Sequence, residues 1–84
     1  MKIDIYYCAQ WNYESKTVSL ADELHRAFKV EANLIQGSDG IFDVVIDGRR
    51  VFSRSDKGRF PEPGEITEEL QKNRWFEIWV AFAL

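Results

Sequence analysis

The sequence Ile3-Asp4-Ile5-Tyr6-Tyr7-Cys8-Ala9-Gln10-Trp11 contains the first predicted strand and the only cysteine of the chain. Side chains alternate along residues 2–8: one side has Ile3, Ile5 and Tyr7, and the other has Lys2, Asp4, Tyr6 and Cys8. This period of two predicts a half-buried strand that ends at Cys8. A strand end near a helix N-terminus is where a protein can lower the pKa of a thiol, because the helix dipole favours the thiolate. Cys8 is therefore the candidate nucleophile.

A helical period begins directly after this stretch and predicts one amphipathic helix over residues 12–28. Its apolar half holds Tyr13, Thr17, Leu20, Ala21, Leu24, Ala27 and Phe28. Its polar half holds Asn12, Ser15, Lys16, Ser19, Asp22, Glu23 and Arg26. The predicted helix has one buried face, and it begins close to Cys8.

Three further strands are predicted. Residues 30–35 alternate again, and Gly37-Ser38-Asp39-Gly40 is typical of a turn. Residues 41–46 and 49–54 flank Asp47-Gly48, a two-residue loop of the type I′ hairpin kind. In this register the core face is expected to hold Phe42, Val44, Ile46 and Val51, and the other face Asp43, Val45, Arg50 and Phe52.

The last third of the chain predicts a loop over residues 57–64 and a final helix from near Glu65, with Ile66 and Leu70 on one face. The order strand, helix, strand, hairpin, helix predicts an α+β fold, a four-stranded mixed sheet packed by two helices. A right-handed crossover makes the first two strands parallel neighbours. Residues 1–84 are expected to form one domain, with residues 75–84 as an aromatic C-terminal extension.

Composition narrows the classes of partner. The net charge of −3 argues against nucleic acid. No apolar run approaches the ~20 residues of a membrane span or the pattern of a signal peptide, and a lone cysteine favours the cytoplasm. There is no glycine-rich phosphate loop, and His25 has no second ligand at metal spacing, so neither a cofactor nor a metal is expected.

Several short motifs, in order and spacing, resemble a known family. They are Tyr7-Cys8-x-x-Trp11-x-Tyr13, Ala21-x-Glu23-Leu24 with Phe28, Gly40-x-Phe42-Asp43-Val44 with Asp47-Gly48, Val51-Phe52-Ser53-Arg54 and Gly58-Arg59-Phe60-Pro61. Over residues 2–74 the chain resembles the selenoprotein W-like (Rdx; SelT/SelW/SelH) proteins. The resemblance implies a thioredoxin-like β-α-β-β-β-α fold with Cys-x-x-Cys or Cys-x-x-selenocysteine at the end of the first strand. Cys8 matches the first residue of that motif, and Trp11 stands in place of the second.

The resemblance also implies a thiol oxidoreductase linked to glutathione and to cell redox homeostasis. With Trp11 where the second thiol would be, Cys8 would form a mixed disulfide with glutathione or a protein thiol, and an external thiol would have to resolve it. Ala9, Gln10 and Trp11 would lie beside the substrate. Two alternatives stay open: an inert strand cysteine, and a non-catalytic protein-interaction module that retains the thioredoxin-like fold.

Basic residues gather in and after the hairpin: Arg49, Arg50, Arg54, Lys57 and Arg59. They are either solvated hairpin charge or a site for the carboxylates of glutathione or of an acidic partner.

The C-terminal residues 75–84 hold four of the nine phenylalanines and tryptophans of the chain. A monomer of this size is not expected to bury both this stripe and the face with Ile66 and Leu70, and exposed apolar patches usually mark an interface. Trp75, Trp79 and Phe82 are therefore expected in a homodimer contact or docking surface. The alternative is that this extension packs across its own core.

Overall fold

The computed structural model describes residues 1–10 and 13–72. The predictions made for Trp11 and for the interface residues Trp75, Trp79 and Phe82 lie outside the described residues. The elements are β1 (Ile3–Cys8), α1 (Tyr13–Phe28), β2 (Asn33–Gly37), β3 (Phe42–Ile46), β4 (Arg49–Ser53) and α2 (Arg54–Lys57), and residues 65–72 form a further helix. None of the helices in this part of the chain is both long and apolar enough to cross a membrane.

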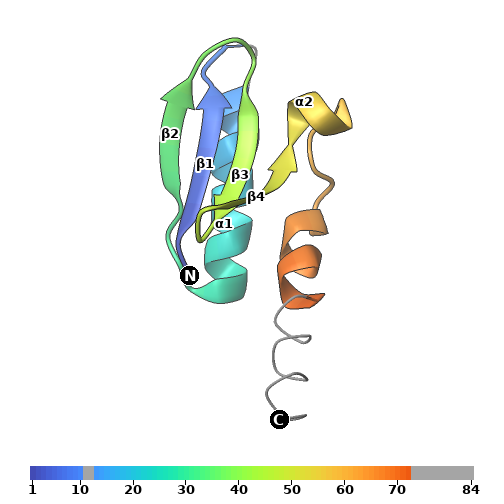
Figure 1. Cartoon of the computed structure of the whole chain (residues 1–84). Helices are drawn as coiled ribbons and strands as arrows, with labels where there is room; N and C mark the ends of the chain where they lie inside the picture. Colours follow the sequence, from blue (N-terminus) through green and yellow to red (C-terminus); the bar gives the residue numbers. More distant parts are fainter. Residues whose placement is uncertain (11–12, 73–84) are drawn as a thin grey trace, which may run out of the picture.

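The four strands form one mixed sheet in the order β2-β1-β3-β4 (Figure 1). β1 pairs in parallel with β2 and antiparallel with β3, and β3 pairs antiparallel with β4. The predicted α+β architecture and the predicted parallel crossover through α1 are therefore confirmed. β1 and β3 each have a neighbour on both sides, and most of the buried strand residues belong to these two strands.

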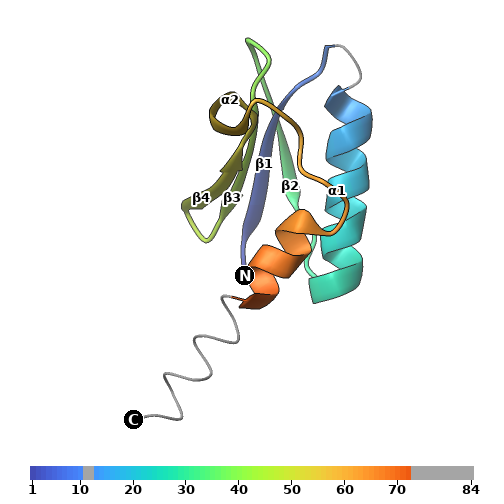
Figure 2. The same ribbon diagram turned by 90° about the vertical axis from the view of Figure 1, so that its right-hand side faces the viewer.

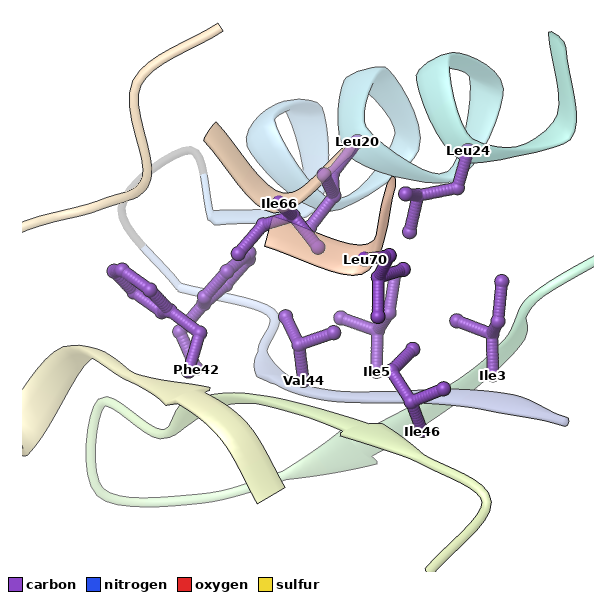
Figure 3. Close-up of a cluster of buried hydrophobic side chains, with 10 residues drawn as sticks. Ile3, Ile5, Leu20, Leu24, Phe42, Val44, Ile46, Ile66 and Leu70 are labelled. Carbon is purple, nitrogen blue, oxygen red and sulfur yellow. The ribbon is translucent and has the colours of Figure 1, made fainter. Parts of the chain in front are cut away.

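The core lies between one face of the sheet and the two longer helices. Figure 3 shows Leu20 and Leu24 of α1, together with Ile66 and Leu70, pointing toward the strands. The core cluster contains Ile3, Ile5, Leu20, Leu24, Phe42, Val44, Ile46, Phe52, Ile66 and Leu70. Because full burial of one such side chain contributes about 1.5–3 kcal/mol, this single layer of contacts is the main stabilising force.

The hairpin between β3 and β4 turns at Asp47 and Gly48, as predicted. Both residues have positive φ, 51° and 81°, which is the geometry of the type I′ turn. The Asp47 carboxylate also accepts a hydrogen bond of 2.7 Å from the Lys2 backbone N–H, and the Asp47 N–H donates to the Lys2 carbonyl at 2.8 Å. The turn is thus tied to the start of β1.

The predicted face assignment in β4 was wrong. Val44 pairs with Phe52 and Val45 pairs with Arg50, so a bulge leaves Val51 without a partner. The extra residue reverses the alternation beyond it. Phe52 consequently lies in the core at 3% exposure, whereas Val51 is only half-buried.

Two boundaries also differ from the prediction. β2 covers Asn33–Gly37 and not residues 30–35, because its extent follows the pairing with β1, which runs from Asp4 with Asn33 to Cys8 with Gly37. Helix α2 begins at Arg54, where the hairpin strand was expected to continue. Both boundaries lie near the strand end that contains Cys8: Gly37 pairs with Cys8, and Arg54 lines the same cleft as Cys8.

The segment between α2 and the last helix is held by carboxylates. Glu23 of α1 accepts hydrogen bonds from the Gly64 N–H at 3.0 Å and from the Thr67 hydroxyl at 2.6 Å. The carboxylate therefore lies at the N-terminus of the helix over residues 65–72, where a negative charge is stabilising. Arg59 binds Glu65 through two hydrogen bonds of 2.7 and 3.0 Å.

The Arg59–Glu65 pair predicts a pH-dependent contribution to stability. The hydrogen bonds from Arg59, and a further one from the Glu62 N–H, lower the pKa of Glu65 from 4.5 to about 2. Because the folded-state pKa is depressed, the stabilisation is complete above pH 4.5 and is lost as the pH falls through about 2. Arg59→Gln is expected to lower the free energy of unfolding only slightly at neutral pH, since solvent screens an exposed ion pair.

Urea unfolding of the parent and of Arg59→Gln at several pH values measures this difference. The difference in free energy of unfolding between the two proteins should shrink toward zero at the lowest pH values. The matched control is Arg49→Gln, because Arg49 is exposed and forms no ion pair with the described residues. A difference for Arg59→Gln that is independent of pH would contradict the assignment.

Candidate functional site

Cys8 lies at the C-terminal end of the central strand. Its N–H donates a hydrogen bond of 2.9 Å to the Ile41 carbonyl, and its neighbour across the parallel pairing is Gly37. The whole residue is 4% exposed and its thiol is free. In Figures 1 and 2 the C-terminal end of β1, the start of α1 and helix α2 all lie toward the same end of the sheet. The cysteine is therefore surrounded by several separate segments.

These segments enclose an open cleft of about 610 Å³, which we term the Cys8 cleft. Cys8, Ala9 and Gln10 line it from the end of β1, Tyr13 from the start of α1, residues 36–40 from the end of β2, and Arg54 from α2. Cys8 is one of the residues that line this open cleft, although the whole residue is only 4% exposed. Ala9 and Gln10, which are predicted to lie beside the substrate, line the same cleft as Cys8, and both are exposed.

One wall of the cleft is formed by residues 36–40, which are the end of β2 and the turn that follows it. Asp39 and Gly40 both have positive φ, 60° and 72°, and the Ile41 N–H closes the turn onto the Ser38 carbonyl at 3.2 Å. A Cβ atom at Gly37 would lie 2.7 Å from Cγ2 of Ile41, which is too close for any side chain without a shift of Ile41. Glycine at position 37 thus allows the β2 strand to end directly beside Cys8.

Two of the residues that line the cleft, Tyr13 and Arg54, belong to a cluster of aromatic rings with a cation. The rings of Tyr13 and Phe60 meet edge to face at 4.7 Å, and Phe60 contacts Phe42 in the same manner at 5.1 Å. The guanidinium carbon of Arg54 lies 5.4 Å from the Tyr13 centroid and 5.2 Å from that of Phe60. These distances are within the range of cation–π attraction, which holds the Arg54 guanidinium against the two rings.

The five basic residues in and after the hairpin lie in different environments. Arg50 pairs with Asp43 and Asp56, and Arg59 pairs with Glu65, so both are used in structural ion pairs. Of the five basic residues, only Arg54 lines the Cys8 cleft. The sequence alone does not distinguish Arg54 from the other basic residues, and it does not identify Tyr13 and Asp39 as cleft residues. The tertiary fold brings all three to the cleft that Cys8 lines.

The cleft supplies one reactive group. Cys8 is the only cysteine of the chain, so two-thiol chemistry within one molecule is excluded by the sequence. His25 is exposed on α1 and does not line the cleft. Among residues 1–10 and 13–72 no group of three histidine, cysteine, aspartate or glutamate side chains is arranged to hold a metal ion. Among the described residues, the cleft is thus lined by one thiol, Cys8, one cation, Arg54, and one anion, Asp39.

Comparison with known proteins gives a consistent result. A model of the Rdx family matches residues 2–72. Curated relatives include Migration and invasion enhancer 1 of Bos taurus, 28% identical over 75 residues, and of Mus musculus, 29% identical over 73 residues. The alignments cover 86% and 83% of this chain, and the chain spans only 64% and 62% of the length of these relatives.

Solved structures share the fold. A selenoprotein W-related protein from Vibrio cholerae superposes with a TM-score of 0.77 at 28% identity, covering 84% of this chain and 92% of that one. A protein from Bordetella parapertussis has a TM-score of 0.78 at 27% identity, with coverage of 86% and 95%. The predicted thioredoxin-like fold and the resemblance to selenoprotein W-like proteins are confirmed. The residues matched by the family model include every residue that lines the Cys8 cleft.

Proposed function

Because this chain belongs to the Rdx family, we propose that it is a glutathione-linked thiol oxidoreductase or redox-sensing protein that acts through Cys8 alone. The observation that carries this proposal is the position of Cys8, which lines an open cleft at the strand end where the family resemblance places its first redox residue. The cytoplasm is the proposed location, since a lone thiol stays reduced in a reducing compartment.

The proposed reaction is a thiol–disulfide exchange in two steps. The Cys8 thiol loses its proton to solvent, and the thiolate attacks one sulfur of oxidised glutathione. The new bond joins Sγ of Cys8 to that sulfur, the glutathione disulfide bond breaks, and one glutathione leaves as a thiolate that takes a proton from solvent. In the second step a glutathione thiolate attacks the glutathionyl sulfur, which regenerates the Cys8 thiolate and oxidised glutathione. The same scheme holds when the disulfide is that of a protein.

Mass spectrometry after incubation with oxidised glutathione tests the proposal. We expect one glutathionyl group on the folded protein, complete removal by reduced glutathione, and no adduct on Cys8→Ser. A parallel incubation in denaturant measures the intrinsic reactivity of the same thiol. If Cys8 is modified only in denaturant, it is an inert strand cysteine and the redox proposal fails.

A second candidate is a non-catalytic protein-interaction module, and the exposure of β2 favours it. All five residues of β2 are exposed, and Leu34 and Ile35 are 41% and 37% exposed. β2 is an edge strand, and an exposed edge with apolar side chains is suited to strand addition by a peptide partner. An unreactive Cys8, together with partner binding that is lost when Leu34 and Ile35 are replaced by threonine, would favour this function over the redox one.

A further inference from the structure

Arg54 is held in place at the Cys8 cleft before any ligand binds. Its guanidinium carbon lies against the neighbouring rings of Tyr13 and Phe60, at 5.4 and 5.2 Å from their centroids. Tyr13 is buried at 6% exposure and Phe60 is partly buried. The two rings restrict the side chain, because moving the guanidinium away would give up both contacts. A cation with this little freedom loses less conformational entropy when it binds a ligand than a free surface arginine does.

The same guanidinium lacks an anionic partner among the described residues. Its Nε atom is buried and donates no hydrogen bond, whereas Arg50 and Arg59 each bind a carboxylate. The terminal nitrogens of the same guanidinium bind no carboxylate of the described residues, so a ligand carboxylate that reaches them from the cleft would gain charge-assisted hydrogen bonds. Arg54 is thus suited to ligand recognition in a way that the other arginines are not.

The cleft contains little other charge. Of its described lining residues, only Arg54 is cationic and only Asp39 is anionic, and Asp39 lies exposed in the turn after β2. Asp39 disfavours anions, so among the described side chains that line the cleft Arg54 is the one that favours an anionic thiol.

We propose that Arg54 is the specificity-determining residue of the Cys8 cleft, where it binds a carboxylate of the low-molecular-weight thiol that is exchanged onto Cys8. This inference rests on the proposed function, because it concerns the substrate of the same thiol. The selected substrate class is a thiol or disulfide with a carboxylate close to its sulfur, such as glutathione. Arg54 takes no part in the covalent step; it raises the rate by holding the carboxylate while the sulfurs exchange.

The test measures the rate of adduct formation on Cys8 with three disulfides of different charge. These are oxidised glutathione, which is anionic, hydroxyethyl disulfide, which is neutral, and cystamine, which is cationic. Arg54→Gln is expected to lower the rate with oxidised glutathione about tenfold relative to the rate with hydroxyethyl disulfide, and to raise the relative rate with cystamine. Any effect of Arg54 on the ionisation of Cys8 changes all three rates by the same factor, so the ratios isolate recognition.

Three controls separate recognition from structure. Arg49→Gln removes the same charge from an exposed residue outside the cleft and should leave the ratios unchanged. Arg54→Lys keeps the charge and should retain part of the preference, although the planar stacking is lost. In the unaltered protein, added salt should slow the reaction with oxidised glutathione more than that with hydroxyethyl disulfide, a measurement that does not depend on the folding of any variant.

The outcomes distinguish this inference from the proposed function. If hydroxyethyl disulfide modifies Cys8 and the ratio to oxidised glutathione is equal in the parent and in Arg54→Gln, the role of Arg54 is overturned while the redox function stands. If no disulfide modifies Cys8 in the folded protein, both fail. A preference that is insensitive to salt and is also lost in Arg49→Gln would likewise overturn the assignment to Arg54.

Discussion

Replacing Leu24 by alanine is expected to lower the free energy of unfolding by about 2–5 kcal/mol. Leu24 is 0% exposed and extends from α1 toward the sheet, above Ile3 and Ile5 of β1 (Figure 3). The deleted atoms leave a cavity that a rigid sheet on one side and a helix on the other cannot close fully. A domain of this length is stable by roughly 4–13 kcal/mol, so the variant should lose a large share of its stability.

The matched control is Val18→Ala on the same helix. Val18 is 52% exposed, so its truncation is expected to change the free energy of unfolding by less than about 0.5 kcal/mol. Urea unfolding followed by circular dichroism gives both values, and an unchanged slope would show that the midpoint alone has moved. Equal midpoints for the two variants would mean that α1 does not pack on the sheet through the face described here.

The second large effect is a gain of chemistry in Trp11→Cys. Position 11 is three residues after Cys8, where the family resemblance places a second cysteine or selenocysteine. An internal thiol attacks the mixed disulfide on Cys8 as an intramolecular reaction, and its effective concentration far exceeds that of a dilute external thiol. We expect an internal disulfide under oxidising conditions, and release of the glutathionyl group without added thiol.

Counting free thiols in the folded protein after mild oxidation measures the first effect, and the loss of the glutathionyl mass measures the second. Trp11→Ser is the control, since it removes the indole and adds no thiol. It should keep a stable adduct on Cys8. Two free thiols that persist in the folded Trp11→Cys variant, but pair readily after unfolding, would show that the backbone does not bring the positions together as the family motif requires.

Local patterns were sufficient wherever the structure depends on neighbours in the chain. The strand that ends at Cys8, the helical period that buries Leu20 and Leu24, and the Asp47-Gly48 turn all appear in the structure as predicted. In each case the periodicity or the backbone preference is a property of a few consecutive residues. The motifs that carry the family resemblance are also short local patterns, and the family model matches residues 2–72, which contain them. The predicted half-burial of the first strand was wrong, because Asp4 and Cys8 on its polar side are buried as well.

Long-range pairing decided what local patterns could not. The bulge that moves Phe52 into the core depends on how β4 pairs with β3, and the end of β2 at Gly37 depends on its register with β1. Neither quantity can be obtained from one segment alone, because a shift of one residue in pairing exchanges the two faces of a strand. At both positions the sequence-based assignment was wrong.

For the functional site, the residue order by itself identified the lone thiol at the end of the first strand and the absence of a second one. The tertiary structure alone selected Arg54 from the five basic residues and brought it to the cleft of Cys8, against the rings of Tyr13 and Phe60. The physical reason is distance along the chain: Cys8 and Arg54 belong to segments whose approach is set by the packing of the whole sheet, and no local pattern encodes it.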